Sequence, residues 1–225
     1  MMRKRHPFGF IRAKNSQRWI VLLLALLALG AVGYSPALAG STPRQGGLNL
    51  TEDQNGNGLA PRFGLRVLKE GMSGPDVRVL NTIIGSRPLF SISLPSPYVF
   101  SSTTKRMVKR FQSRRDLKPT GVVNRRTTKR LVGSMKTYGA SWYGPGFYGN
   151  QTACGRTLKR STVGLAHKTL PCGTKVLVGY RGRYLLTRVI DRGPYIAGRT
   201  WDLTNGAREA LRYSGIDRVR AAVAR

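Results

Sequence analysis

The stretch Val189-Ile190-Asp191-Arg192-Gly193-Pro194-Tyr195 sets the organisation of the C-terminal half of the chain. It follows apolar, β-prone residues at 184–186, and the whole run predicts a buried strand that ends at the Gly-Pro turn. Asp191 stands where this strand ends, so it either bonds to backbone in the turn or is placed for chemistry. A second acid follows shortly afterwards, in Trp201-Asp202-Leu203-Thr204.

Short β-prone segments separated by Gly-rich turns surround this stretch. The expected strands are 140–143, 163–166, 175–180, 183–190 and 219–223. One helix is expected over 205–213, because Thr204 is a good N-cap residue and Gly215 a helix stop. Regularly spaced short strands within 138–225 predict a small, mainly β barrel with one helix.

The chain has two cysteines, Cys154 and Cys172, both in its C-terminal half. Two cysteines and so few histidines make a poor zinc set, because the usual four-ligand spacing is absent. We therefore expect one disulfide, formed in an oxidising compartment, and neither a metal nor another cofactor.

Residues 1–39 have the pattern of an export signal. Six basic residues accompany an apolar run over 19–33, and Ala37-Leu38-Ala39 supplies a small-x-small cleavage site. The run is shorter than the roughly 20 residues that cross a bilayer as a helix. We expect a secreted cell-wall protein that meets the membrane only during export, with a flexible linker over 40–62. The alternative is an uncleaved anchor.

The composition is strongly basic, with 39 Lys and Arg against 9 Asp and Glu and a net charge of +30. Loss of the leader lowers the charge to about +24, which still attracts polyanions. Residues 105–130 hold eleven basic residues and one acid, Asp116, without an aromatic ladder on which bases could stack. We expect anionic wall polymers as partners and no nucleic acid; the alternative is that the charge only maintains solubility.

Residues 63–134 predict short helices. Residue patterns typical of helix N-termini occur at Ser73-Gly74-Pro75-Asp76, where a polar N-cap is expected, at Ser102-Thr103 and near Asn124. Apolar residues follow at helical spacing.

This segment resembles the bacterial peptidoglycan-binding domain, a small all-α three-helix module. The matching residues are Leu68-Lys69-Glu70-Gly71, Ser73-Gly74-Pro75-Asp76-Val77, Leu80, Thr104, Val108, Phe111-Gln112, Leu117, Thr120-Gly121-Val122-Val123, Arg126-Thr127 and Leu131. Asn81 departs from the family, which usually has Gln there, and 87–100 is longer and more apolar than usual. The resemblance implies peptidoglycan binding without catalysis; the alternative is a spacer.

Residues 138–225 resemble the rare lipoprotein A (RlpA)-like double-psi β-barrel family, a six-stranded barrel. The matching motifs are Ala140-Ser141-Trp142-Tyr143-Gly144-Pro145-Gly146, Gly149, Thr152-Ala153-Cys154-Gly155, Ala166-His167-Lys168-Thr169-Leu170-Pro171-Cys172-Gly173-Thr174, Asp191-Arg192-Gly193-Pro194 and Asp202-Leu203-Thr204. Characterised members of the family act as lytic transglycosylases on peptidoglycan. Expansins share the barrel and loosen wall polymers without measurable hydrolysis.

The barrel is poor in acids, which favours lytic cleavage over hydrolysis. Hydrolysis of a glycoside generally needs two carboxyl groups, whereas in lytic cleavage the substrate's own hydroxyl closes a ring and one carboxyl can act as acid and then base. Glu209 is expected on the exposed side of the helix and Asp217 in a loop, so Asp191 and Asp202 remain as the candidate catalytic acids. The resemblance implies that His167 joins Asp191 and Asp202 in the catalytic site.

One departure from the family bears on catalysis. The family's catalytic glutamate follows the Gly of the Thr-Ala-x-Gly motif, where this chain has Arg156, which cannot donate a proton near neutral pH. Either Asp191 or Asp202 then does the acid's work, or the groove binds glycan without cutting it. The residues expected to bind substrate are Tyr143, Tyr195, Trp201, Arg156 and Arg192.

The sequence thus predicts an exported, monomeric wall protein that binds peptidoglycan glycan strands. We expect a lytic transglycosylase with Asp191 as acid and base. The alternatives are an expansin-like module that loosens the wall without catalysis, which Arg156 favours, and a scaffold held to the wall by charge alone.

Overall fold

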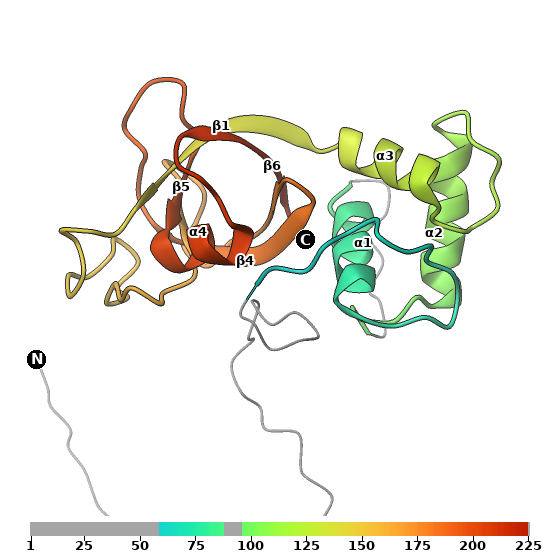
Figure 1. Cartoon of the computed structure of the whole chain (residues 1–225), viewed down its shortest axis with the longest axis horizontal. Coiled ribbons are helices and arrows are strands. Elements are labelled where there is room, and N and C mark those ends of the chain that lie inside the picture. The colour runs from blue at the N-terminus through green and yellow to red at the C-terminus, as the bar shows by residue number, and fades with distance from the viewer. Residues whose placement is uncertain (1–58, 88–95, 225) are drawn as a thin grey trace, which may run out of the picture. The chain divides into compact units, whose positions relative to one another are not determined.

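The computed structural model describes residues 59–87 and 96–224, which Figure 1 shows in colour. The expected leader over 1–39 and most of the expected linker over 40–62 lie outside the described residues. Within the described ranges, no helix has both the length and the apolar character needed to cross a bilayer.

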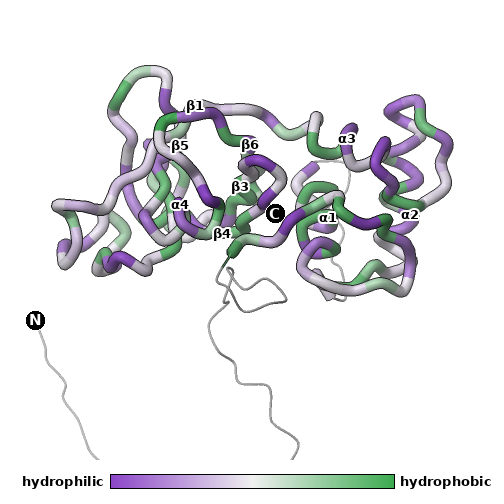
Figure 2. Tube along the Cα trace, viewed as in Figure 1, coloured by the Kyte–Doolittle hydropathy of each residue, from purple (hydrophilic) through white to green (hydrophobic). Residues whose placement is uncertain are grey.

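The described residues before the barrel contain α1 at Pro75–Gly85, α2 at Ser102–Ser113 and α3 at Arg125–Gly133, joined by non-helical segments (Figure 1). Hydrophilic residues recur between apolar ones along α2 and α3 (Figure 2), so that each helix buries one side. The buried apolar residues include Leu68, Val77, Leu80, Ile83, Ile84, Phe100, Met107, Val108, Phe111, Val123 and Leu131. The helix starts agree with the predicted signals, whereas the number of helices in the whole module stays a prediction.

The N-cap of α1 differs from the expected one. It is Gly74, whose missing side chain leaves the first turn without a side-chain cap. The carboxylate of Asp76 instead accepts two hydrogen bonds from the guanidinium of Arg66, at 2.6 and 2.8 Å. An acid in the first turn also interacts favourably with the helix dipole, so Asp76 stabilises this end in place of a polar cap.

Asn81, where the family usually has Gln, is a buried residue of α1 that contacts α2. Its amide nitrogen donates to the carbonyls of Pro97 and Val99, at 2.9 and 3.2 Å. Its amide oxygen accepts from the hydroxyl of Thr104 at 2.9 Å. A buried amide with these partners does not carry the cost of an unsatisfied polar group, so the shorter side chain fits the core.

The C-terminal part is a closed barrel of six strands with one helix, as predicted. The strands are β1 (Lys136–Tyr143), β2 (Leu165–Ala166), β3 (Lys175–Tyr180), β4 (Arg183–Asp191), β5 (Trp201–Thr204) and β6 (Asp217–Val223), and α4 spans Asn205–Leu211. Their order around the barrel is β1-β5-β2-β4-β3-β6. The pairs β1/β5 and β2/β4 are parallel and the other pairs antiparallel, so the sheet is mixed. The strand at 201–204 was not among the segments predicted individually.

The barrel core comes from alternate residues of the strands and the inner side of α4. It contains Ala140, Leu165, Val176, Val178, Leu185, Val189, Trp201, Leu203, Ala207, Leu211, Tyr213 and Val219. The hydroxyl of Thr204 accepts from the backbone N–H of Ala207 at 3.3 Å, which confirms the predicted cap of α4. Glu209 is exposed on this helix, as expected.

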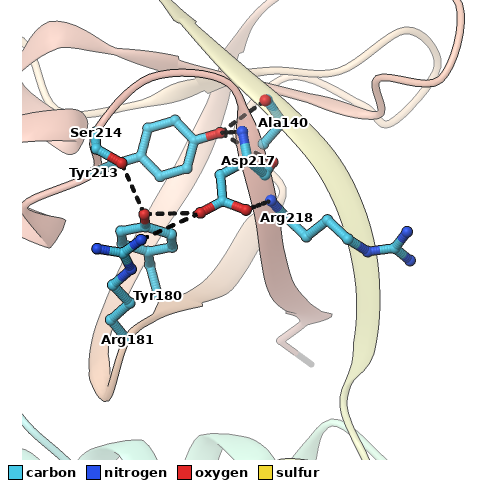
Figure 3. Close-up of polar contacts among 7 residues, drawn as sticks. All are labelled: Ala140, Tyr180, Arg181, Tyr213, Ser214, Asp217 and Arg218. Atoms are coloured by element: carbon cyan, nitrogen blue, oxygen red, sulfur yellow. Dashed lines mark hydrogen bonds and ion pairs between the residues drawn. The ribbon is translucent and has the colours of Figure 1, made fainter.

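Asp217 lies at the start of β6 and not in a loop, which corrects the expectation (Figure 3). Its carboxylate accepts from the hydroxyl of Tyr180 on β3 at 2.9 Å and from the backbone N–H of Arg218 at 2.7 Å. The hydroxyl of Tyr213 accepts from the backbone N–H of Asp217 and donates to the carbonyl of Ala140 on β1, at 2.8 and 2.7 Å. These bonds fix the connection between α4 and β6 and keep Asp217 in a structural role.

Candidate active site in the barrel

Two acids meet across the short strand β2. This strand lies between β4 and β5, and Ala166 is the register partner of both Asp191 and Asp202. Since neighbouring strands are about 4.8 Å apart, the Cα atoms of the two acids are about 10 Å apart. The small side chain of Ala166 leaves room between them, and all three residues line one pocket.

Asp191 is the last residue of β4 and is partly buried. Its Oδ1 accepts hydrogen bonds from the backbone N–H groups of Ala153 and Arg192, at 2.9 and 2.8 Å. Both donors are backbone groups, so they hold this carboxylate in a fixed position at the end of β4. Asp191 therefore both binds backbone at the turn and lines the pocket, and its catalytic role stays a prediction.

Asp202 is the second residue of β5 and has a different environment. The hydroxyl of Ser141, its register partner on β1, donates to its Oδ1 at 2.7 Å. Burial raises the pKa of the Asp202 carboxyl, against the effect of this hydrogen bond, and the negative charge of Asp191 raises it further. Asp202 is therefore the pocket acid whose surroundings favour the protonated form.

The pocket between the two acids has a volume of about 270 Å³. Its rim is apolar and open to solvent, with Tyr195 79% exposed, Phe147 55% exposed and Ile196 also exposed. Sugar rings have apolar faces that pack on such side chains, so an acidic floor with an apolar rim suits a glycan. Within residues 59–87 and 96–224, no three His, Cys, Asp or Glu side chains are grouped to hold a metal ion.

Tyr143 ends β1 and lines the same pocket. Its phenolic oxygen is buried and, within the described residues, makes no hydrogen bond of standard geometry. Burial raises the pKa of this phenol, and the negative charges of Asp191 and Asp202 raise it further. The phenol thus keeps its proton and is a hydrogen-bond donor beside the Asp191 carboxylate.

His167 does not line the pocket, although the sequence placed it in the catalytic site. Its Nδ1 accepts hydrogen bonds from the backbone N–H groups of Thr169 and Leu170, at 3.1 and 3.0 Å. Burial, and then the positive charge of Arg192, lower the pKa of this imidazole. A neutral ring that accepts at Nδ1 carries its proton on Nε2 and organises the turn after β2.

Trp201 belongs to the core and not to the surface of the groove, which corrects the expectation. It is 3% exposed, and its ring packs against those of Tyr138 and His167, with centroids 6.1 and 4.5 Å away. The burial follows from the alternation along β5, in which Trp201 and Leu203 face the core and Asp202 faces the pocket.

The two arginines predicted to bind substrate differ in position. Arg192 lines the pocket, and its guanidinium donates to the carbonyl of Leu170 at 3.0 Å. Arg156 is exposed and does not line the pocket. The predicted disulfide is present, with the Cα atoms of Cys154 and Cys172 5.7 Å apart, and it joins the Arg156 loop to the segment after His167.

Sequence reasoning missed several residues of the site, among them Ser141 and Phe147. Ser141 donates to Asp202, and Phe147 forms part of the rim. The alternation of side chains along β1 places Ser141 and Tyr143 on one face, which was a usable signal for Ser141. Phe147 lies in a loop, where no periodicity indicates a direction.

Comparisons with known proteins show which families the two parts of the chain match. Residues 135–223 match the family described as lytic transglycolase. Residues 90–131 match the family described as putative peptidoglycan binding domain. Both resemblances drawn from the motifs are confirmed.

The barrel is similar to named curated proteins. It is 44% identical over 87 residues to the probable endolytic peptidoglycan transglycosylase RlpA of Synechocystis sp., covering 38% of this chain and 26% of the relative. It is 47% identical over 70 residues to the endolytic peptidoglycan transglycosylase RlpA of Campylobacter jejuni, covering 30% and 26%. The matches thus span about a quarter of the length of these relatives. A crystal structure of a Clavibacter michiganensis expansin matches 40% of this chain and 50% of its own, with 21% identity and a TM-score of 0.34.

Proposed function

We propose that this chain is a secreted, monomeric cell-wall protein that binds peptidoglycan and cleaves its glycan strands as a lytic transglycosylase. In this proposal a three-helix module over 63–134 holds the wall, and a double-psi barrel over 138–225 cuts it. The observation that carries the proposal is the pocket in which Asp191 and Asp202 lie on either side of Ala166. The names of the relatives support the reaction.

The two acids take different roles in the proposed reaction. Burial raises the pKa of Asp202, which favours it as the proton donor, whereas the sequence alone had favoured Asp191. Asp191, held by two backbone N–H groups on Oδ1, stabilises the positive charge that develops at the sugar's anomeric carbon.

The proposed steps balance in protons. Asp202 gives its proton to the oxygen that links two sugars, and the bond from that oxygen to the anomeric carbon breaks. The C6 hydroxyl of the same sugar then bonds to the anomeric carbon and returns its proton to Asp202. The products are a 1,6-anhydro end and a free hydroxyl, without consumption of water.

The other pocket residues bind and orient the glycan in this proposal. The phenol of Tyr143 donates a hydrogen bond, Tyr195 packs on a sugar ring, and Arg192 faces an acidic group of the strand. His167 positions the turn that follows β2. Arg156, at the family's glutamate position, lies outside the pocket lining, which supports assigning the acid's work to Asp202.

A second candidate is expansin-like loosening of the wall without cleavage. Arg156 favours it, because the chain lacks the family's acid at that position. An open pocket with an apolar rim serves binding as well as cleavage, so the two functions differ only in the products.

Digestion of purified peptidoglycan, followed by mass spectrometry of the fragments, tests the proposal. Wild type is expected to release fragments with anhydro-muramic ends, and Asp202→Asn and Asp191→Asn to release few. Glu209→Gln removes an exposed carboxylate away from the pocket and serves as the matched control with full activity. Intact strands together with retained wall binding would overturn the enzyme in favour of the expansin-like function.

A further inference from the structure

A second cavity, in the helical part, has the opposite charge to the barrel pocket. It is lined by Arg115, Arg126, Lys129, Arg130, Gly133 and Ser134 and has a volume of about 530 Å³. We call it the basic groove. Neither an acid nor an aromatic residue is among its lining residues. Its volume lies within the roughly 300–1,000 Å³ of ordinary ligand sites.

The periodicity of α3 places most of these cations together. Thr127 and Leu131 face the core, so Arg126, Lys129 and Arg130, spaced three and four residues apart, share the exposed side. Arg115 joins them from the segment just after α2. Four exposed cations therefore line one concave surface.

Among residues 59–87 and 96–224, no acidic side chain pairs with a cation of the groove. The ion pairs within the described residues use Arg66, Lys105, Arg160, Arg181 and Arg208 as cations, and none uses a cation of the groove. Unpaired like charges at this spacing repel one another, so a bound polyanion would lower the electrostatic energy of the folded state.

Arg87 adds a further positive charge beside the groove. Its guanidinium donates to the hydroxyl of Ser134 and lies 4.9 Å from the ring centroid of Phe111, over which Arg115 also lies, at 6.0 Å. Burial, and then the charge of Arg115, lower the pKa of Arg87. Two guanidinium groups held on one ring are thus fixed in position even without a ligand.

We propose that the basic groove binds a phosphodiester polymer of the cell wall, a chain of alditol phosphates. Arginine forks bind phosphate oxygens in pairs, and a polymer with one phosphate per repeat supplies several charges along the groove. A nucleic acid fits less well, because no aromatic side chain offers a surface for its bases. The choice of a wall polymer rests on the proposed wall location, whereas the groove itself shares no lining residue with the proposed cleavage site.

Fluorescence anisotropy with a labelled glycerol-phosphate oligomer and the full-length chain tests the site. The groove variant is Arg126→Gln/Lys129→Gln/Arg130→Gln. The matched control is Arg106→Gln/Arg110→Gln/Lys118→Gln, which removes the same charge from exposed positions outside the groove. Thermal melts of both variants verify folding.

At low salt, the groove variant is expected to bind the oligomer at least about tenfold more weakly than wild type. A plot of the logarithm of its association constant against the logarithm of the salt concentration should have a slope smaller by about two. The control variant is expected to stay within about threefold of wild type, since it keeps all phosphate contacts. Equal losses in the two variants would overturn the site in favour of a diffuse positive field. Equal binding of polyglutamate would overturn the phosphate assignment, and tighter binding of a DNA oligomer would reassign the groove to nucleic acid.

Discussion

The barrel pocket and the basic groove differ in how the chain builds them. The pocket uses two of the chain's nine acids, which lie on different strands and meet only through β2. The groove uses four of 39 basic residues, three of them within five positions of one helix. A pocket of scarce, half-buried groups depends on the tertiary structure, whereas a groove of abundant exposed groups depends on local periodicity.

This difference has consequences that experiments can separate. Changes in the pocket are expected to alter chemistry and stability, because its groups are buried and held by several elements. Changes in the groove are expected to alter affinity for polyanions and little else, because surface substitutions usually change stability by about 0.5 kcal/mol or less.

The largest effect is expected from Asp191→Asn/Asp202→Asn. The double variant should lose about 10²–10⁴-fold in cleavage rate, the range that one general acid or base contributes. It should be about as slow as the slower single variant, because residues that act as a unit are not additive. Initial rates on soluble glycan fragments measure this, with the triple groove variant as the control that keeps its activity. If the rate loss of the double variant equalled the product of the losses of the two single variants, the two acids would act independently.

Removal of the disulfide should destabilise the barrel. For a loop of 18 residues the entropic effect on the unfolded state is about 3 kcal/mol, so Cys154→Ser/Cys172→Ser should lower the free energy of unfolding by that amount. Urea unfolding measures the change. The free energy of unfolding of the triple groove variant, measured alongside, should remain near that of wild type. A similar loss of stability in the groove variant and the cysteine variant would contradict the difference between the two regions.

Gly139→Ala should have an intermediate effect on the barrel. A Cβ at this position would lie 2.2 Å from the carbonyl oxygen of Gly198, so the segment that also carries Tyr195 must move. We expect a loss of about 1–3 kcal/mol in stability, with weaker binding of glycan fragments.

Gly133→Ala is the matched control for that substitution. Gly133 lines the basic groove, and no atom lies within 4 Å of the added methyl group. As a helical position it should gain up to about 1 kcal/mol from the change. Equal losses of stability in Gly139→Ala and Gly133→Ala would contradict this prediction. The loss at Gly139 would then come from the lost backbone flexibility of glycine and not from a steric clash with Gly198.

The smallest effect is expected from the pH dependence that His167 adds to stability. The folded pKa of His167 is lowered, so its contribution is complete above the unfolded pKa of about 6.5 and is lost as pH falls through the folded value. The melting temperature of wild type should therefore fall more between pH 8 and pH 5 than that of His167→Asn. Parallel pH profiles would show that the ring titrates in the folded chain as it does in the unfolded one.

Several features of this fold could be predicted from local patterns. The apolar run at 184–190 predicted β4, and turn residues separated most of the strands correctly. Thr204 and Asn124 were recognised as caps because their side chains act on neighbouring backbone. Asp191 and Asp202 emerged by elimination, since Glu209 and Asp217 had other expected positions.

Other features had no local signal. Polar chemistry predicted a side-chain cap for α1, yet Gly74 occupies that position and Asp76 interacts with Arg66 instead. The aromatic character of Trp201 fitted the groove as well as the core. The turn geometry that ties Nδ1 of His167 to backbone became visible only once the chain was folded.

By itself, the sequence determined the class of the barrel, the basic character of the helical part and the identity of the two pocket acids. These depend on residue type and on spacing along the chain. Only the tertiary structure decided that Ala166 separates Asp191 from Asp202, that Tyr143 joins them and that His167 does not line their pocket. The physical reason is that strand register and burial arise from pairing between distant segments, and burial raises the pKa of the Asp202 carboxyl.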